Sequence, residues 1–218
     1  MGLTVSAKES GIINLPGVTG GGVPRRHYYT VSEYLAGEDA GDFRSEYVDG
    51  EIFDIAGASV AHTVLIANLI YLLYKAAKGN GFTLLPTEIK IRIESPSRFY
   101  YPDLIAAKTP VARYGKRRDT ITEPTLIAEV LSDSTKRTDR GEKWQAYKAI
   151  PSLRVYLLIA QDTMRVEQWS RGENGDWQSE PTVSVGEDAV VALPILGTSV
   201  ALADLYDTVP FDDDAPDV

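Results

Sequence analysis

Residues 100–107 of this chain read YYPDLIAA, and residues 126–132 read LIAEVLS. Both segments are short apolar runs that contain one carboxylate, Asp103 in the first and Glu129 in the second, and this pattern is typical of buried β-strands. Burial of a carboxylate in such surroundings costs free energy unless a cation or hydrogen-bond donors contact it. If the two strands are neighbours in one sheet, about 5 Å apart, both carboxylates can bind one divalent ion. Magnesium or manganese suits oxygen ligands of this kind.

The length and composition predict one α/β or α+β domain. The 218 residues are 44% hydrophobic and 24% charged, which is enough for a sizeable core. The absence of cysteine excludes disulfides and thiolate zinc sites and fits a reducing cytosol, so we expect a cytoplasmic protein. No secretory signal is visible at the N-terminus. Asn68 and Lys75 interrupt the longest apolar run, residues 64–77, which we interpret as a core helix without a membrane partner.

The net charge of −9 argues against a general polyanion binder, because nucleic-acid affinity rests largely on Lys and Arg. The charges are unevenly distributed, however. Residues 108–148 carry ten basic and six acidic side chains, whereas residues 204–218 carry six aspartates and no base. The basic excess therefore surrounds the proposed metal site and keeps nucleic acid among the expected partners. For residues 113–118 alone, a solvated charged loop is an equal alternative.

The chain divides into three parts by composition: a flexible Gly-rich arm (1–26), a folded domain (27–206) and an acidic tail (207–218). Within the first half of the domain, Thr30 and Glu33 have the spacing of a capping box, which predicts a short helix. The Asp-Gly pair at positions 49 and 50 predicts a β-hairpin over residues 45–55. A long helix over 58–78 and one strand over 82–94 should follow.

The sequence of the second half of the domain predicts mostly β-strands. A strand carries Asp103, a polar loop spans 108–124, and a strand carries Glu129. The spacing of Asp139 and Glu142 predicts a capped helix over 139–150. The remaining expected elements are a central apolar strand at 153–160, a hairpin around Asn174-Gly175, a strand at 190–193 and a helical turn within 200–206.

The order helix, three strands, helix, strand over residues 58–160 is that of the PD-(D/E)xK nuclease core, and the chain resembles the Uma2 family, also known as DUF820, of restriction endonuclease-like proteins. The resemblance spans residues 29–206 and rests on motifs at 46–51 (EYVDGE), His62, 102–105 (PDLI), 129–132 (EVLS), Asp139, Lys143, Tyr147 and 155–159 (VYLLI). It implies an α/β (α+β) restriction endonuclease-like fold, with a mixed central sheet flanked by helices and with extra β-hairpins.

The resemblance also implies roles for individual residues. In the nuclease fold an aspartate and a glutamate on adjacent strands bind magnesium, which points to Asp103 and Glu129, with the carbonyl of Val130 as a third ligand. A lysine two residues after the glutamate helps to activate water there, but this chain has Leu131. Lys143 matches the lysine that the family carries on the following helix.

Four further residues are candidates for the same site. Glu46 would complete the metal ligands or act as the base, and His62, Arg140 and Tyr147 would contact the substrate. Asp139, Lys143 and Tyr147 share one helix face through their spacing of four.

Each candidate also has an ordinary structural interpretation. Asp103 would be a solvent-facing turn residue, Glu129 the partner of an interior Lys or Arg, and Lys143 part of a solvated helix face. His62 would bond to the hairpin and Glu46 would pair with Arg44. The aromatic residues Trp144, Tyr147, Trp169 and Trp177 are most simply explained by packing.

The sequence supports two main hypotheses for the function. The first is a Mg²⁺- or Mn²⁺-dependent endonuclease that hydrolyses phosphodiester bonds, with DNA as the expected substrate. The second is a nuclease-fold protein without catalysis that binds nucleic acid or protein. A purely structural α/β protein is a third, weaker alternative. Symmetric dimers are the common solution for enzymes that cut both strands, so a homodimer is one assembly that the sequence leaves open.

Overall fold

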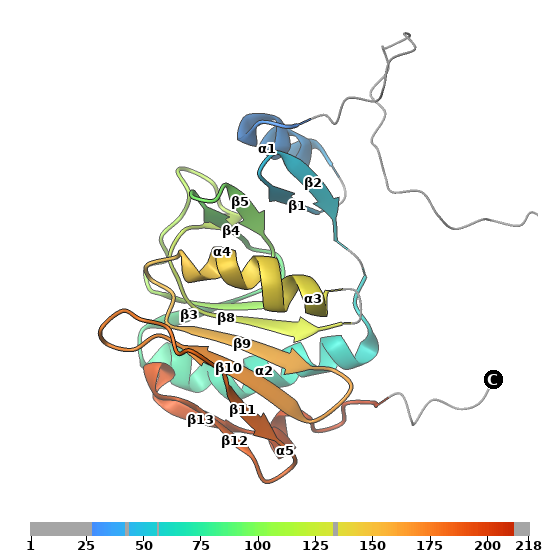
Figure 1. The fold of residues 1–218 in the computed structure, drawn as a ribbon, viewed down its shortest axis with the longest axis vertical. Helices are drawn as coiled ribbons and strands as arrows, with labels where there is room; N and C mark the ends of the chain where they lie inside the picture. The colour runs from blue at the N-terminus through green and yellow to red at the C-terminus, as the bar shows by residue number, and fades with distance from the viewer. Residues whose placement is uncertain (1–27, 42–43, 56, 133–134, 212–218) are drawn as a thin grey trace, which may run out of the picture.

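The computed structural model describes residues 28–41, 44–55, 57–132 and 135–211. Its centre is a six-stranded sheet (Figure 1). The strand order is β11 (Thr182–Val185), β10 (Arg165–Ser170), β9 (Val155–Ala160), β8 (Pro124–Leu131), β6 (Leu104–Lys108) and β3 (Phe82–Pro86). The sheet is mixed because β8 and β9 run parallel whereas the other neighbours are antiparallel. The Gly-rich arm expected at 1–26 and the last seven residues of the acidic tail lie outside the described residues.

A second sheet lies above the first in Figure 1. Its order is β2 (Glu51–Asp54), β1 (Ser45–Val48), β5 (Arg98–Tyr100), β4 (Lys90–Ile93) and β7 (Thr120–Ile121). A third pair joins β12 (Val190–Leu193) and β13 (Thr198–Ala201). The helical elements are α1 (Val31–Ala40), α2 (Val60–Gly79), α3 (Lys136–Thr138), the π-helical turn η1 (Asp139–Lys143), α4 (Trp144–Lys148), the 3₁₀ turn η2 (Pro194–Leu196) and α5 (Leu202–Leu205).

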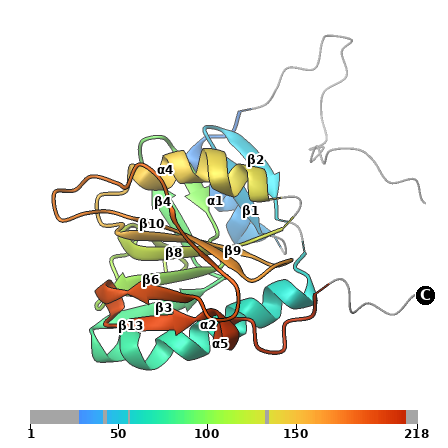
Figure 2. The ribbon, with the colours of Figure 1, turned by 60° about the horizontal axis from the view of Figure 1, so that its bottom comes forward.

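Helices cover both faces of the six-stranded sheet, with α4 on one side and α2 on the other (Figures 1 and 2). Side chains alternate along a strand, so Leu126, Ala128 and Val130 of β8 pack into the core beside α2, β13 and α5. Ile127 and Leu131 pack into the second core, beside α4 and β4. Position 129 therefore belongs to the face that α4 covers.

Helix α2 is a core helix, as expected from the sequence. By length and composition alone it is also apolar enough to cross a membrane. Its inner face, formed by Leu65, Leu69, Leu73 and Ala77, is buried in the first core. The apolar side chain of Val60 is 70% exposed, because Val60 is the first helical residue and lies beyond the packed inner face.

Local signals predicted several elements correctly. Thr30 caps α1, and its hydroxyl and the Glu33 carboxylate form the reciprocal bonds of a capping box. The hairpin of β1 and β2 turns at Asp49 and Gly50, both with positive φ, as a tight two-residue turn requires. The strand at 190–193 and the central position of β9 are also confirmed.

The single strand expected over residues 82–94 is wrong, because β3 and β4 lie in different sheets. Pro86 has no N–H to continue the ladder, and the Thr87 N–H donates to the carbonyl of Asp103. Similarly, Pro102 separates β5 from β6, so Asp103 stands immediately before its strand rather than within it. The interruption between β3 and β4 and the one between β5 and β6 both occur where the chain crosses from one sheet to the other.

The capped start expected at Asp139 is also wrong. The helix begins three residues earlier, at Lys136, and Asp139 has helical dihedral angles and is buried. The capping-box spacing of Asp139 and Glu142 misled the sequence analysis because a buried carboxylate inside a helix has the same local pattern. The chain continues from α3 through η1 into α4.

Candidate active site

Asp103, the residue immediately before β6, lies opposite Glu129 of the adjacent strand β8. The antiparallel register pairs Leu104 with Ala128, which places Asp103 across from Glu129 on the same face of the sheet. The Asp103 N–H lies 3.3 Å from Glu129 Oε2, and the Val130 N–H donates to Asp103 Oδ2 at 2.7 Å. Val130 thus contacts Asp103 through its N–H, whereas the family resemblance implies that its carbonyl is a metal ligand.

Glu129 is buried beneath the helical segment that follows its strand. Only 3% of the residue is exposed. Tyr147 donates its hydroxyl to Glu129 Oε1 at 2.9 Å, and Lys143 Nζ lies 3.4 Å from the same oxygen. Burial, followed by the charge of Glu129, raises the pKa of Tyr147 well above its usual range, so its hydroxyl remains a proton donor. Because Tyr147 is fully buried, its contact is with Glu129 rather than with solvent.

Lys143 joins three carboxylates. Its Nζ lies 3.1 Å from Glu46 Oε1, 3.4 Å from Glu129 Oε1 and 3.4 Å from Asp139 Oδ1. The interpretation of Lys143 as a solvated helix residue is therefore wrong, since it is buried. Asp139 and Lys143 are the first and last residues of η1, and π-helical turns are frequent at functional sites.

Glu46 reaches the site from the second sheet. It lies on β1, and its Oε1 also accepts the N–H of Tyr101 at 3.2 Å. Arg44, its alternative partner in the sequence analysis, pairs with Glu88 instead. The site therefore forms where β1, the ends of β6 and β8, and η1 meet.

His62 contacts Asp103 from α2, the helix on the other face of the sheet from α4 (Figures 1 and 2). It lies in the first turn of α2, where the Ser59 hydroxyl accepts its backbone N–H. Its Nε2 is 3.1 Å from Asp103 Oδ2, so its recorded partner is the carboxylate and not the hairpin. The other ring nitrogen, Nδ1, is buried without a hydrogen-bond partner among the described residues.

The charges of the site do not balance. Glu46, Glu129 and Asp139 surround one lysine, Lys143, and the backbone N–H of Asp103 contacts Glu129. Burial raises the pKa of Glu129 well above its usual range; the charge of Lys143 opposes this rise, and the other carboxylates add to it. Burial likewise raises the pKa of Asp139. Burial by itself would lower the pKa of Lys143, but the carboxylates around it outweigh burial and raise the pKa. The site thus favours an additional positive charge.

The residues present fit a hard divalent cation by their chemistry. Carboxylate and carbonyl oxygens are its preferred ligands, and the site has excess negative charge. Asp139 Oδ1 is buried and, apart from its 3.4 Å ion pair with Lys143, makes no hydrogen bond within the described part of the chain. Within that same part, no group of three acidic or histidine side chains forms a metal-binding cluster. The two carboxylates of Asp103 and Glu129 therefore need a backbone oxygen to complete the protein ligands.

The remaining sequence candidates lie around this centre. Leu131, at the position of the motif lysine, is buried in the second core beside Trp144. Arg140 is partly exposed and pairs with Glu167, with 2.9 Å between Nη2 and Oε1. Trp144 contacts Trp169 and Trp177 at ring-centroid distances of 4.7 and 4.8 Å, which agrees with the packing interpretation of these tryptophans.

Asp139 was missing from the sequence-based site. Its spacing of four from Lys143 placed it on the correct helix face, but its apparent role as a cap concealed its burial next to the lysine. No local signal connects Glu46 with Tyr101 or Lys143, because these contacts join distant segments.

Comparisons with known proteins agree with this geometry. Residues 31–203 match the family described as "Uma2: Putative restriction endonuclease". The "uncharacterized protein sll1609" of Synechocystis sp. is 35% identical over 162 residues, which cover 74% of this chain and 90% of that protein. The "uncharacterized protein slr1290" of the same organism is 32% identical over 145 residues, which cover 66% and 75%.

A solved structure supports the fold. The crystal structure of a "putative nuclease belonging to DUF820" from Anabaena variabilis matches with a TM-score of 0.63 and 17% sequence identity. The match covers 77% of this chain and 92% of that one. Together with the mixed sheet and its flanking helices, these similarities show that the protein has a restriction endonuclease-like α+β fold and belongs to the Uma2 family.

Proposed function

We propose that this protein is an endonuclease that uses Mg²⁺ or Mn²⁺ to hydrolyse phosphodiester bonds in DNA. The observation that carries the proposal is the excess of buried negative charge where β6 and β8 place Asp103 opposite Glu129. A structural ion pair would need one lysine for one carboxylate. Here three carboxylates contact Lys143, and a fourth, that of Asp103, lies next to Glu129, which supports a site that accepts a divalent cation.

Asp103 and Glu129 would hold the ion, together with the Val130 carbonyl. When bound, a divalent ion lowers the pKa of water and stabilises charge on a phosphoryl oxygen. Lys143 would supply positive charge next to the phosphate, in place of the lysine that Leu131 replaces. Glu46 would orient Lys143 through their 3.1 Å contact or accept a proton from water.

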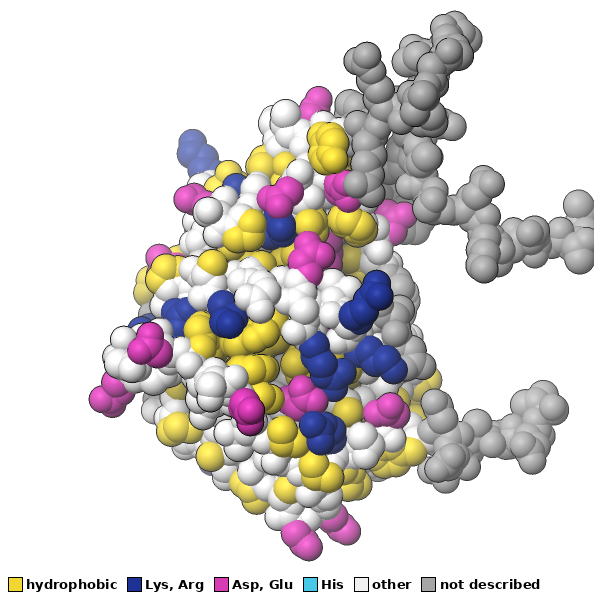
Figure 3. Space-filling view, viewed as in Figure 1, with side chains coloured by type: hydrophobic (Ala, Val, Ile, Leu, Met, Phe, Trp, Pro, Cys, Tyr) yellow, Lys and Arg dark blue, Asp and Glu magenta, His cyan; other side chains and the backbone are white. Residues whose placement is uncertain are grey.

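Basic side chains beside the site support a nucleic-acid substrate. Lys136 and Arg137 are exposed on α3, Arg140 follows on η1, and Arg165 begins β10. Figure 3 shows Lys and Arg side chains gathered over the region of α3 and the ends of β9 and β10. Cations of this kind neutralise backbone phosphates in protein complexes with DNA. This local basicity offsets the net charge of −9 of the whole chain.

One observation favours a second function, a nuclease-fold module that binds without cutting. Glu129 Oε1 accepts hydrogen bonds from Tyr147 and Lys143, and Glu129 Oε2 accepts the Asp103 N–H. Asp103 Oδ2 accepts the Val130 N–H and contacts His62. These oxygens already have protein partners, so metal binding would require Lys143 or His62 to move.

Metal-induced thermal stabilisation tests the proposed site. We expect millimolar Mn²⁺ to raise the Tm of the wild type, because binding to the folded state contributes about 2.7 kcal/mol at one hundred times Kd. Asp103→Ala and Glu129→Ala should abolish the shift, and Lys116→Ala, in an exposed loop, should preserve it. An unchanged shift in both acidic variants would remove the metal site and with it the enzyme proposal.

Cleavage assays distinguish the two functions. Plasmid and single-stranded DNA should be cut in Mg²⁺ or Mn²⁺, and Lys143→Ala should abolish cleavage while DNA binding persists. Metal-stimulated binding without cleavage by the wild type would favour the binding module. Sedimentation of the same samples tests the homodimer, and the cytoplasmic location is part of the proposal that localisation in the native host tests.

A further inference from the structure

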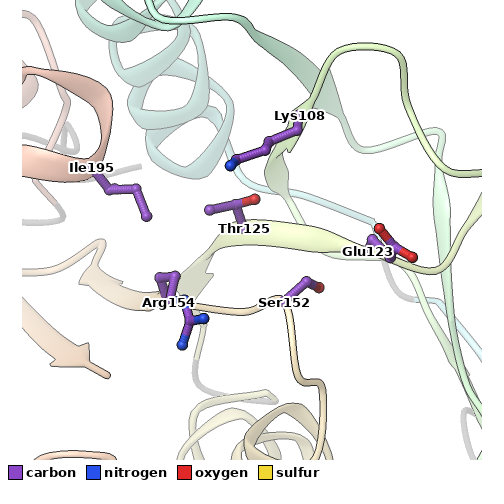
Figure 4. A pocket seen from close by; sticks show the side chains of 6 residues that line it. All are labelled: Lys108, Glu123, Thr125, Ser152, Arg154 and Ile195. Carbon is purple, nitrogen blue, oxygen red and sulfur yellow. The ribbon is translucent and has the colours of Figure 1, made fainter. Parts of the chain in front are cut away.

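One pocket lies away from Asp103 and Glu129. It has a volume of about 240 Å³ and is lined by Lys108, Glu123, Thr125, Ser152, Arg154 and Ile195 (Figure 4). Thr125 is the second residue of β8 and precedes Glu129 by four residues, a separation of roughly 13 Å along an extended strand. The pocket and the candidate active site thus occupy opposite ends of the same strand.

Two cations line this pocket without an anionic partner. Lys108 is the last residue of β6, and Arg154 immediately precedes β9. Neither side chain forms an ion pair or hydrogen bond within the part of the chain that the structure describes. Burial, and then the positive charge of Arg154, lower the pKa of the neighbouring Arg171. Arg154 therefore acts as an uncompensated charge.

Hydroxyl groups lie beside the two cations. The Ser152 hydroxyl donates to the Pro124 carbonyl at 2.8 Å, which fixes its oxygen at the pocket wall. The Thr125 hydroxyl makes no hydrogen bond to the described residues, although Thr125 is largely buried. Figure 4 shows the amino group of Lys108 beside Thr125, and Arg154 on the other side of Thr125 with its guanidinium directed away from Lys108. The wall therefore offers a hydroxyl beside Lys108 and a second positive charge on Arg154.

Glu123 does not neutralise this group. It forms no ion pair with Lys108 or Arg154 among the described residues, and Figure 4 shows its carboxylate apart from them, beyond Ser152. Glu123 and Lys108 are both exposed, so solvent screens the charge of each, whereas Arg154 is half-buried. The two cations outnumber the one carboxylate that lines the pocket.

We propose that this pocket is a second ligand site, independent of the proposed nuclease activity, that binds the phosphate group of a small molecule. A phosphate monoester carries a charge of about −1.5 to −2 at neutral pH and several strong acceptor oxygens. These properties match two unpaired cations and a free hydroxyl, and Arg binds such oxygens through two parallel hydrogen bonds. The pocket is smaller than drug-sized sites of about 300 to 1,000 Å³. Its ligand is therefore inorganic phosphate or one phosphorylated metabolite.

Isothermal titration with two probes tests the site. Inorganic phosphate and adenosine 5′-monophosphate are titrated into the full chain at constant ionic strength, without divalent metal, and adenosine serves as the control without phosphate. We expect saturable binding of both phosphate probes and none of adenosine. Tighter binding of the nucleotide would identify a phosphorylated metabolite as the ligand, and equal affinity would identify the phosphate group alone.

Two double variants that remove the same charge, one in the pocket and one in an exposed loop, test whether phosphate binds in the pocket. Lys108→Gln/Arg154→Gln should weaken phosphate binding by about tenfold or more, because it removes both charged donors. Lys116→Gln/Arg118→Gln removes the same charge from an exposed loop and should leave Kd unchanged. If the double pocket variant does not fold, each single substitution should weaken binding to an intermediate degree. Absence of saturable binding to the wild type, or equal weakening by the pocket and loop variants, overturns the proposal.

Discussion

Two lysines of this protein are buried among carboxylates, and their surroundings differ in charge balance. Lys90, the first residue of β4, lies 3.0 Å from Glu38 and 2.8 Å from Asp119. A second cation, Arg117, pairs with Asp119 and Asp39 in the same cluster. Among the described residues, no second cation of this kind accompanies Lys143, which contacts Glu46, Glu129 and Asp139.

The pKa values of the carboxylates reflect this difference. Burial would raise the pKa of Glu38, but hydrogen bonds from Tyr101, Lys90 and Ser45 outweigh it and lower the pKa below its usual range. The pKa of Asp119 is lowered in the same manner, by Arg117 and Lys90 against burial. Beside Lys143, by contrast, burial outweighs the charge of the lysine and raises the pKa of Glu129.

This comparison separates a structural cluster from a candidate site. The Lys90 cluster is charge-compensated and holds α1 against β4 and the loop before β7. The Lys143 cluster retains negative charge that protons or a metal ion can neutralise. The predictions below test this distinction, from the largest expected effect to the smallest.

Replacement of Lys90 by Met should cause the largest loss of stability. It would leave the ionised Glu38 and Asp119 without their shared cation, and breaking a buried ion pair in this way costs about 3–5 kcal/mol. Urea unfolding measures the loss, with Lys116→Met as the exposed control. A change of less than about 1 kcal/mol would show that Lys90 does not hold this region together.

Replacement of Lys143 by Ala should affect catalysis most. If Lys143 stabilises charge next to the phosphate, its loss should reduce kcat by about 10²–10³-fold, the usual effect of removing one such group. Lys148→Ala, on the same helical segment, should retain most activity. A comparable loss in both variants would indicate a structural effect of the helix and contradict the assigned role.

Substitution of glutamate by glutamine should have opposite effects in the two clusters. In metal-free buffer near neutral pH, Glu38→Gln should destabilise the protein by about 1–3 kcal/mol, because charged hydrogen bonds are lost. Glu129→Gln should stabilise it, because a neutral side chain replaces a carboxylate whose ionisation the fold disfavours. Thermal unfolding with EDTA compares the two, and destabilisation in both variants would contradict the proposed charge imbalance.

The same two glutamates predict opposite pH dependences. The pKa of Glu129 is raised above its ordinary value of 4.5, so the native state binds the extra proton and stability falls as pH rises above about 4.5. The pKa of Glu38 is lowered, so its contribution is present above about 4.5 and is lost as pH falls. The free energy of unfolding of Glu129→Gln should thus exceed that of the wild type by an amount that grows with pH. Urea titrations between pH 5 and 8 measure this difference.

The smallest effect is expected at the rim of the Lys90 cluster. Asp39 forms two contacts with Arg117, but its side chain is 60% exposed. Exposed ion pairs contribute about 0–1 kcal/mol, so Asp39→Asn should shift the urea midpoint only slightly. A loss as large as that of Lys90→Met would show that the cluster depends on its exposed edge.

Features that depend on neighbouring residues were predictable from the sequence. The hairpin follows from Asp49 and Gly50, and the start of α1 from Thr30 and Glu33. The alternating pattern over residues 82–94 could not show that β3 and β4 join different sheets, because alternation continues unchanged across the break. The helix start at Lys136 was missed because Asp139 has the residue type of a cap but lies buried inside the helix.

The sequence by itself determined the strand that carries Glu129, the strand that begins directly after Asp103, the helical segment that presents Lys143, and the membership of the family. Their apolar runs and spacings are local properties of the chain. Only the tertiary structure decided that Glu46 from another sheet joins Lys143, that Lys90 is compensated and that Lys108 and Arg154 share a pocket. Burial and charge balance depend on which distant segments pack together, and pairing across strands and sheets is what fixes them.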